Sequence, residues 1–242
     1  MNSKVLIPFL VLAFTSFYTA PAFATDAGGM DMGTTSDMFA HPFWVHMGVP
    51  DKPGEVDIRL LGYRYRFHGF AGGDFGLHLE AGLLPGLGIH IRADGIYNEP
   101  DGEIMLMYSF LHDSEMNNGI SVFGEAEIPT GAGGDVTTQY VFGLSGRLTA
   151  GQVVVWDGNL HYNPKEKMYE YESSFVFRMS SKIYPLVEAK GHSSPDMATL
   201  SVLPGVKFKI NDSSALGLGV RIPVLDDKEY DSRAELTYDF WF

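Results

Sequence analysis

The chain has 242 residues, no cysteine and a formal net charge of −13 at pH 7. Without cysteine, disulfide bonds, thiolate metal sites and thiol catalysis are excluded, so strand pairing and burial must stabilise the fold. The negative charge argues against nucleic acid or anionic lipid as the main partner. With 28 glycines and 13% aromatic residues, the composition is typical of a turn-rich β protein.

The first 24 residues have the three parts of a secretory signal peptide. A basic start ends at Lys4, an apolar run follows from Val5 to Phe17, and Ala22-Phe23-Ala24 offers a small-x-small cleavage site. The alternative is a membrane-anchoring helix, but the apolar run is shorter than the ~20 residues that a span requires. The sequence therefore predicts export, with a signal peptide over residues 1–24.

Residues 25–54 are rich in Gly, Met, Pro and Asp and have no sustained hydrophobic period, which predicts an irregular segment in the periplasm. Thioether and imidazole groups suit Cu(I), so a metal role for this segment is one hypothesis, with candidate ligands Met30, Met32, Met38, His41, His46 and Met47. The alternative is incidental methionines, with Phe43 and Trp44 at the membrane surface. We predict no cofactor and no metal site in the remainder of the chain.

Residues 55–242 break into short alternating runs separated by turn residues. We count about twelve: 55–68, 74–83, 87–97, 103–112, 119–129, 136–149, 152–162, 169–182, 183–191, 198–210, 214–224 and 231–242. Bacterial single-chain barrels use even numbers of antiparallel strands, and a strand that crosses lipid takes ~9–11 residues. The sequence therefore predicts an all-β fold, a closed antiparallel up-and-down transmembrane β-barrel of about twelve strands.

The last run alternates apolar and polar residues and ends on Phe242, which looks like an outer-membrane insertion signal. Its apolar face should point to lipid and its polar face inward; the inward residues are Glu235, Thr237 and Asp239. A half-buried strand of a soluble sandwich would alternate in the same way. The ending predicts the barrel-assembly machinery as a partner of the last strand.

Aromatic residues near the run ends favour the barrel over the sandwich, because aromatic girdles lie at membrane interfaces. We place on the apolar face Tyr63, Tyr65, Phe67, Tyr108, Phe110, Tyr140, Phe142, Trp156, Tyr162, Tyr238 and Phe240. The sequence therefore predicts a location in the cell outer membrane, with its lipid around the wall.

Turn positions follow if Phe242 lies at the periplasmic rim. Short linkers such as Leu84-Pro85-Gly86 are then periplasmic turns, and residues 70–73 form one of the outward loops. The last strand should pair with the first, near residues 63–67. Counting back from a loop at 192–197 places Pro185 opposite Pro204, where neither proline needs a donor for that neighbour.

The inward face supplies the candidate site residues. Pairing around Leu84-Pro85-Gly86 sets Glu80 opposite His90 and His78 opposite Arg92. The predicted lumen-lining residues are His78, Glu80, His90, Arg92, Glu125, Glu127, Glu172, Arg178, Glu188, Lys207, Arg233 and Glu235. Both signs are abundant, so the interior either forms a salt-bridged plug that stabilises the wall or lines a narrow polar pore.

An enzyme would require a catalytic constellation, and the best candidate is His192-Ser193-Ser194-Pro195-Asp196. It falls at a predicted loop, and no Gly-x-Ser-x-Gly elbow occurs in the chain. Asp157, Asn159 and His161 share an inward face, which lumen polarity explains. The sequence predicts that the protein is not an enzyme.

The stretch from His46 to Phe67, with a Gly-Glu pair followed by Tyr-Arg-Tyr at the entry to the first strand, resembles the transporter-like family associated with phenol meta-pathway degradation. The resemblance implies an outer-membrane channel for small, often hydrophobic molecules and no residue-level site. We therefore predict a channel or transporter that passes an unknown small solute through a narrow polar lumen. The alternatives are a closed structural or surface-interaction barrel, and a barrel with a metal-binding N-terminal segment.

Overall fold

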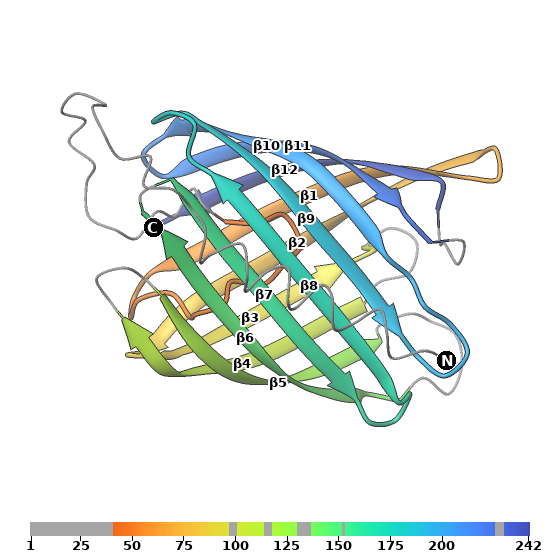
Figure 1. The fold of residues 1–242 in the computed structure, drawn as a ribbon, viewed down its shortest axis with the longest axis horizontal. Helices are drawn as coiled ribbons and strands as arrows, with labels where there is room; N and C mark the ends of the chain where they lie inside the picture. Colours follow the sequence, from red (N-terminus) through yellow and green to blue (C-terminus); the bar gives the residue numbers. More distant parts are fainter. Residues whose placement is uncertain (1–40, 97–100, 114–117, 130–136, 152, 226–229) are drawn as a thin grey trace. The chain divides into compact units, whose positions relative to one another are not determined.

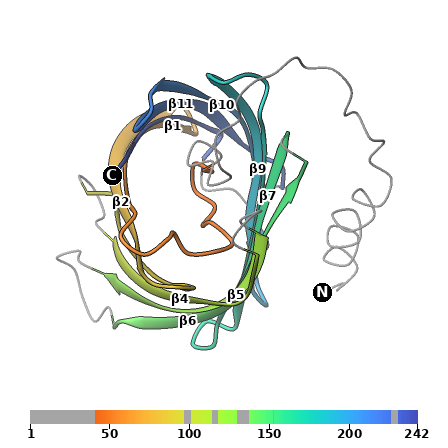
Figure 2. The same ribbon diagram turned by 90° about the vertical axis from the view of Figure 1, so that its left-hand side faces the viewer.

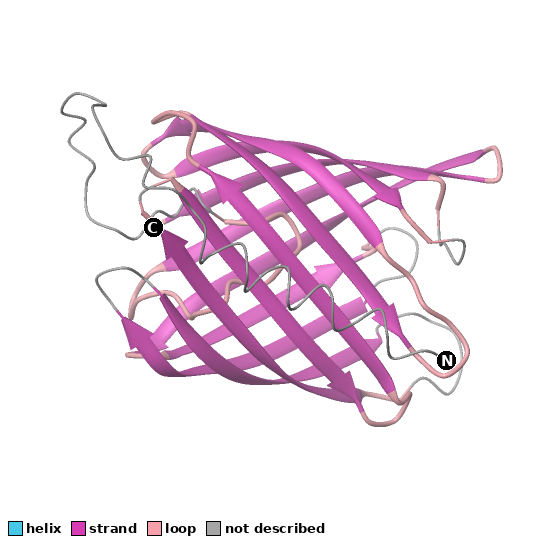
Figure 3. Ribbon diagram, viewed as in Figure 1, coloured by secondary structure: helices cyan, strands magenta, loops and turns pink. Residues whose placement is uncertain are grey.

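The computed structural model describes residues 41–96, 101–113, 118–129, 137–151, 153–225 and 230–242. All regular structure in these ranges is β-strand (Figures 1 and 3). The strands are β1 (Val56–Phe67), β2 (Phe70–Leu84), β3 (Leu87–Asp94), β4 (Asp101–Asp113), β5 (Asn118–Pro129), β6 (Gln139–Ala150), β7 (Val154–Asn163), β8 (Met168–Phe177), β9 (Ile183–Ser193), β10 (Ser201–Asn211), β11 (Ser214–Pro223) and β12 (Ser232–Trp241). Within the described ranges, no helix is long and apolar enough to cross a membrane.

The twelve strands form one closed ring. Each strand pairs antiparallel with its neighbours in sequence, and β1 pairs with β12, from Asp57 opposite Trp241 to Arg66 opposite Ser232 (Figure 2). Closure leaves no strand edge, so the backbone N–H and C=O groups along the wall find partners within the sheet. The prediction of a closed, antiparallel, up-and-down barrel of twelve strands is confirmed.

The two faces of the ring differ in polarity. In β12, Leu236 and Phe240 are exposed on the outer face, while Glu235, Thr237 and Asp239 are buried on the inner face. The same alternation continues around the ring, and mid-strand leucines exposed on the outside include Leu60, Leu106, Leu144 and Leu218. Apolar groups outside and ionised groups inside are the reverse of a water-soluble sandwich and suit a wall in lipid.

The predicted outward loop at residues 70–73 is wrong, because these residues begin β2. The β1–β2 connection is the two-residue turn His68-Gly69, and both residues have positive φ, 47° and 85°. Positive φ at both central residues matches the twist of a tight β-hairpin, and Gly69 adopts it without a Cβ clash. This hairpin extends past its neighbours at one end of the barrel (Figure 1).

The predicted place of Tyr63 in the outer aromatic girdle is also wrong. Tyr63 has the same parity in β1 as the buried Asp57 and Arg59, and its ring lies 6.1 Å from that of Trp44 inside the barrel. Tyr65 and Phe67 share this parity. The outer face of this stretch instead carries Arg64. Because polar groups occur on both faces, the alternation no longer shows which face points outward.

The predicted pairing of Pro185 with Pro204 is wrong by two residues. Pro185 lies opposite Val206, and Pro204 lies opposite Val187. The register is set at the turn, where the Ser194 amide donates to the Met197 carbonyl at 2.8 Å, so the β9–β10 hairpin closes more tightly than the predicted loop at 192–197 allows.

The outer wall gives a first testable prediction. Leu144 lies mid-strand in β6, 52% exposed and opposite Val122 and Leu160. Because arginine on the lipid face near the bilayer midplane costs ~2–4 kcal/mol, Leu144→Arg should lower the unfolding free energy of vesicle-inserted protein by that amount in urea titrations.

The matched control is Val153→Arg, at the turn that follows β6. Near the interface an arginine costs only about 0–1 kcal/mol. Equal losses for the two variants would contradict a lipid-facing wall.

Candidate functional site

The interior of the ring holds an irregular stretch of chain, residues 41–54, which we call the inner segment. Its residues 41–50 are all buried. It lies inside the ring (Figure 2), and its hydrogen bonds reach β1, β5, β7, β9 and β10. The sequence predicts residues 25–54 as a periplasmic segment with Phe43 and Trp44 at the membrane surface; in its described part, these two side chains are instead 0% and 7% exposed inside the barrel. Residues 1–40, which include the predicted signal peptide and Met30, Met32 and Met38, lie outside the described residues.

Trp44 of the inner segment contacts side chains of several strands. Its indole N–H donates to Glu235. Its backbone N–H lies 3.3 Å from Oε2 of Glu188, and Oε1 of the same carboxylate accepts from the Phe43 amide. The guanidinium carbons of Arg92 and Arg233 lie 4.6 and 4.5 Å from the indole ring centre. Cation–π contacts of this kind strengthen when water is excluded, so Trp44 joins β3, β9 and β12 at one point.

Gly48 fixes the middle of the inner segment. Its N–H donates to Asp157 at 2.8 Å, and its carbonyl accepts from the hydroxyls of Ser121 at 2.8 Å and Ser145 at 3.2 Å. A Cβ at this position would lie 2.0 Å from the backbone carbonyl carbon of Gly146 in β6. Only glycine allows so close an approach of two backbones.

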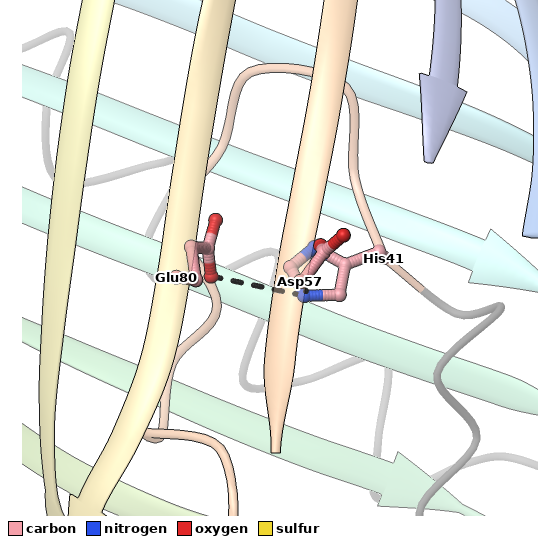
Figure 4. Close-up of side chains that lie close together, drawn as sticks. All are labelled: His41, Asp57 and Glu80. Carbon is pink, nitrogen blue, oxygen red and sulfur yellow. Dashed lines mark ion pairs between the residues drawn. The ribbon is translucent and has the colours of Figure 1, made fainter. Parts of the chain in front are cut away.

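The start of the inner segment lies beside an ion-pair network on β1, β2, β10 and β12. Arg59 pairs with Asp239 at 2.6 Å, and Lys207 pairs with the same carboxylate at 2.9 Å. Figure 4 shows the His41 imidazole beside Asp57 and Glu80, with its Nε2 at 3.5 and 3.7 Å from their carboxylate oxygens. These charges are buried, so each depends on its partners for stabilisation.

The predicted site residues lie as follows. The register places His78 opposite Arg92 and Glu80 opposite His90, as predicted. Nine of the twelve are buried: His78, Glu80, His90, Arg92, Glu125, Glu172, Glu188, Lys207 and Glu235. Glu127 and Arg233 are half-buried, and Arg178 follows the end of β8. The sequence analysis did not single out Asp57, Arg59, Ser121 or Ser145 as site residues; their parity in β1, β5 and β6 is the signal that could have identified them.

A cavity of about 130 Å³ lies beside Trp44. Its lining includes Lys190, Arg221, Tyr230 and Arg233, and no carboxylate lines it among the described residues. His192, the histidine of the candidate catalytic group, also lines it, but its Nδ1 lies 3.0 Å from the hydroxyl of Thr199. The imidazole is therefore hydrogen-bonded to a threonine rather than to a serine nucleophile.

Comparison with known proteins identifies the architecture. No family model matches the chain, and no curated protein matches it. Among solved structures, the KdgM porin superposes with a TM-score of 0.62 at 11% identity, covering 77% of this chain and 99% of the porin. The fold is that of outer-membrane porins. The NanC porin gives 0.56 at 10% identity, covering 76% and 97%, and an outer-membrane channel from Pseudomonas putida F1 gives 0.58 at 9% identity, covering 81% and 98%.

Replacement of Gly48 by alanine should loosen the inner segment without altering the wall. Overpacking costs about 1–3 kcal/mol, so the displaced population should rise ~5- to 150-fold. Because the chain has no native cysteine, a single Val45→Cys reporter, at a site 0% exposed, measures this rise as faster modification by a water-soluble thiol reagent.

Two controls accompany that labelling. Gly62→Ala on β1 adds a Cβ with no atom within 4 Å, and it should leave the reporter protected. A cysteine in place of Asp212, whose side chain is 99% exposed, should react at one rate in every background. Unchanged protection of Val45→Cys in the Gly48→Ala protein would contradict the tight seating of Gly48.

Proposed function

We propose that the protein is an outer-membrane channel or transporter for small molecules and that the inner segment holds its lumen closed. The observation that carries this proposal is an apolar-walled barrel whose polar interior contains a segment held by hydrogen bonds and ion pairs. The wall closes on itself through β1 and β12 without the inner segment, so the segment can leave while the barrel persists.

Burial supports a closed conformation. A wide aqueous pore would expose the inner wall, yet Glu188, Lys207 and Asp239 are 0% exposed, as are Phe43 and Val49 of the inner segment. On opening, water would take the place of the inner segment's amide and carbonyl groups as hydrogen-bond partner of the charged side chains on the inner wall.

Location and partners belong to the same proposal. The fold shared with porins, the apolar outer face and the predicted signal peptide support insertion in outer-membrane lipid, with the barrel-assembly machinery engaging β12. The resemblance of residues 46–67 to the transporter-like phenol meta-pathway family supports small molecules as the cargo. We propose no catalytic role, since His192, the histidine of the candidate catalytic group, is hydrogen-bonded to Thr199.

Conductance tests the channel directly. Wild-type protein in planar bilayers should show rare or small openings, and Gly48→Ala should raise the open fraction by the same ~5- to 150-fold factor as the thiol labelling, because one displacement governs both. Gly62→Ala should behave as wild type.

The alternative function is a permanently closed barrel that acts through its surface. The density of buried ion pairs, such as Arg221 with Glu188 at 3.2 Å and with Glu235 at 2.8 Å, favours it. Silent bilayers from Gly48→Ala protein that is folded, and whose Val45→Cys reporter has become reactive, would overturn the channel and leave this alternative.

A further inference from the structure

Histidine and glutamate side chains gather where the inner segment meets β4 and β5. His46 of the inner segment, Glu103 of β4 and Glu125 of β5 each place one potential ligand atom within 4.8 Å of the other two. Two more imidazoles flank them. Nδ1 of His90 on β3 lies 3.4 Å from Nδ1 of His46, and the ring centre of His161 on β7 lies 6.0 Å from that of His46.

The nearby cation Arg92 is shared among several carboxylates. Arg92 pairs with Asp94 at 2.5 Å and with Glu103 at 3.4 Å. Glu125 is 6% exposed, and its Oε2 has no hydrogen-bond partner among the residues that the structure describes. A buried carboxylate without a partner is costly, and a bound cation would offset that cost.

An independent observation points to the same place. Nε2 of His161 is buried and lies 3.9 Å from the nearest carboxylate oxygen of Glu172, and within the described ranges it too has no hydrogen-bond partner. Both atoms lie beside His46, and a buried polar atom without a partner requires an explanation.

We propose that His46, Glu103 and Glu125 bind a divalent transition-metal cation of the Zn²⁺ class, with His90 orienting the His46 ring. Imidazole together with carboxylate oxygen is a donor set suited to Zn²⁺, Ni²⁺ or Cu²⁺, whereas Mg²⁺ and Ca²⁺ take oxygen ligands. Ligands ~2.1 Å from a tetrahedral Zn²⁺ lie ~3.4 Å apart, so side-chain rotations that bring the three atoms together by about 1 Å complete the site.

The other histidine–carboxylate cluster, His41 with Asp57 and Glu80 (Figure 4), is a poor site for a cation. Its His41 Nδ1 contacts the Arg59 guanidinium, which only donates hydrogen bonds. Nδ1 must therefore accept, so the proton of the neutral imidazole lies on Nε2, which has no hydrogen-bond partner among the described residues and offers no lone pair to a cation. Arg59 also brings a positive charge to this cluster.

A cation at His46 would tie the inner segment to the wall at β4 and β5. This goes beyond the sequence hypothesis of a Cu(I) site, because the ligands come from the barrel as well as from the segment and are imidazole and carboxylate rather than imidazole and thioether. The proposal does not depend on channel activity, since a closed structural barrel could bind the same ion.

Zn²⁺ titration of tag-free, detergent-folded protein by calorimetry tests the site. Wild-type protein should bind one Zn²⁺, and its thermal unfolding should shift upward with Zn²⁺ in excess. Glu125→Gln, which keeps shape and removes charge, should abolish both effects, as should His46→Asn. His90→Asn should weaken binding about 10- to 100-fold, as expected for a residue that orients a ligand.

Matched controls separate this site from its surroundings. His41→Asn removes the other cluster, and His68→Asn removes an exposed histidine at a turn residue of positive φ that asparagine tolerates; both should bind as wild type does. The proposal is overturned if wild-type protein binds no Zn²⁺, if Glu125→Gln binds it unchanged, if His41→Asn loses it, or if Ca²⁺ competes at equal concentration.

Discussion

The pairing of β1 with β12 is the constraint on which the remainder of the structure depends. In lipid, an open sheet edge would leave backbone groups without partners, so the first and last strands must meet. They do so to the end, where the Val56 amide donates to the Phe242 carbonyl at 2.9 Å and the Phe242 amide donates back at 3.1 Å. Closure also creates the Arg59–Asp239 pair, which joins residues 180 positions apart. This ion pair therefore exists only in the closed ring.

The buried charges and the inner segment depend on each other. Glu188 and Asp157 accept backbone N–H groups of the inner segment, while Arg59 and Lys207 donate to its carbonyls at Phe43 and Pro42. Backbone groups used in this way are unavailable for a helix or strand, which explains why the segment is irregular although it is buried. The wall in turn keeps its ionised groups out of water because the segment supplies partners for them.

Local patterns predicted the wall well and the interior poorly. A period of two and turn residues were enough for the twelve strands, and the short turn at Leu84-Pro85-Gly86 fixed His78 opposite Arg92. The predicted pairing of Pro185 was wrong because the β9–β10 connection is longer, and hydrogen bonds within that turn determine the register. Where both faces of a strand carry polar groups, as around Tyr63, alternation no longer tells inside from outside.

The position of the inner segment is not encoded in any local pattern. Its partners lie far along the chain: Asp157 is 109 positions from Gly48, and Glu235 is 191 positions from Trp44. The segment has no period because its residues alternate between strands of a surrounding ring rather than between two faces of one sheet. Its only sequence signals are glycine, histidine and aromatic residues in a stretch without a period, and these residues fit an exposed linker equally well.

The polarity of the interior is what makes an opening transition physically reasonable. If apolar side chains filled the lumen, displacing them would expose apolar surface to water on both the segment and the wall. Here many of the groups uncovered are carboxylates, guanidinium groups and amides, which water solvates in place of the segment, while Phe43, Val45 and Val49 are apolar groups that would also be exposed. Individual contacts of the segment are hydrogen bonds, several of them to charged groups, and each is worth only about 0.5–3 kcal/mol net, whereas the wall is a continuous ladder with no free edge. The interface between segment and wall is therefore the weakest part of the closed structure, and a cation at His46 would act there.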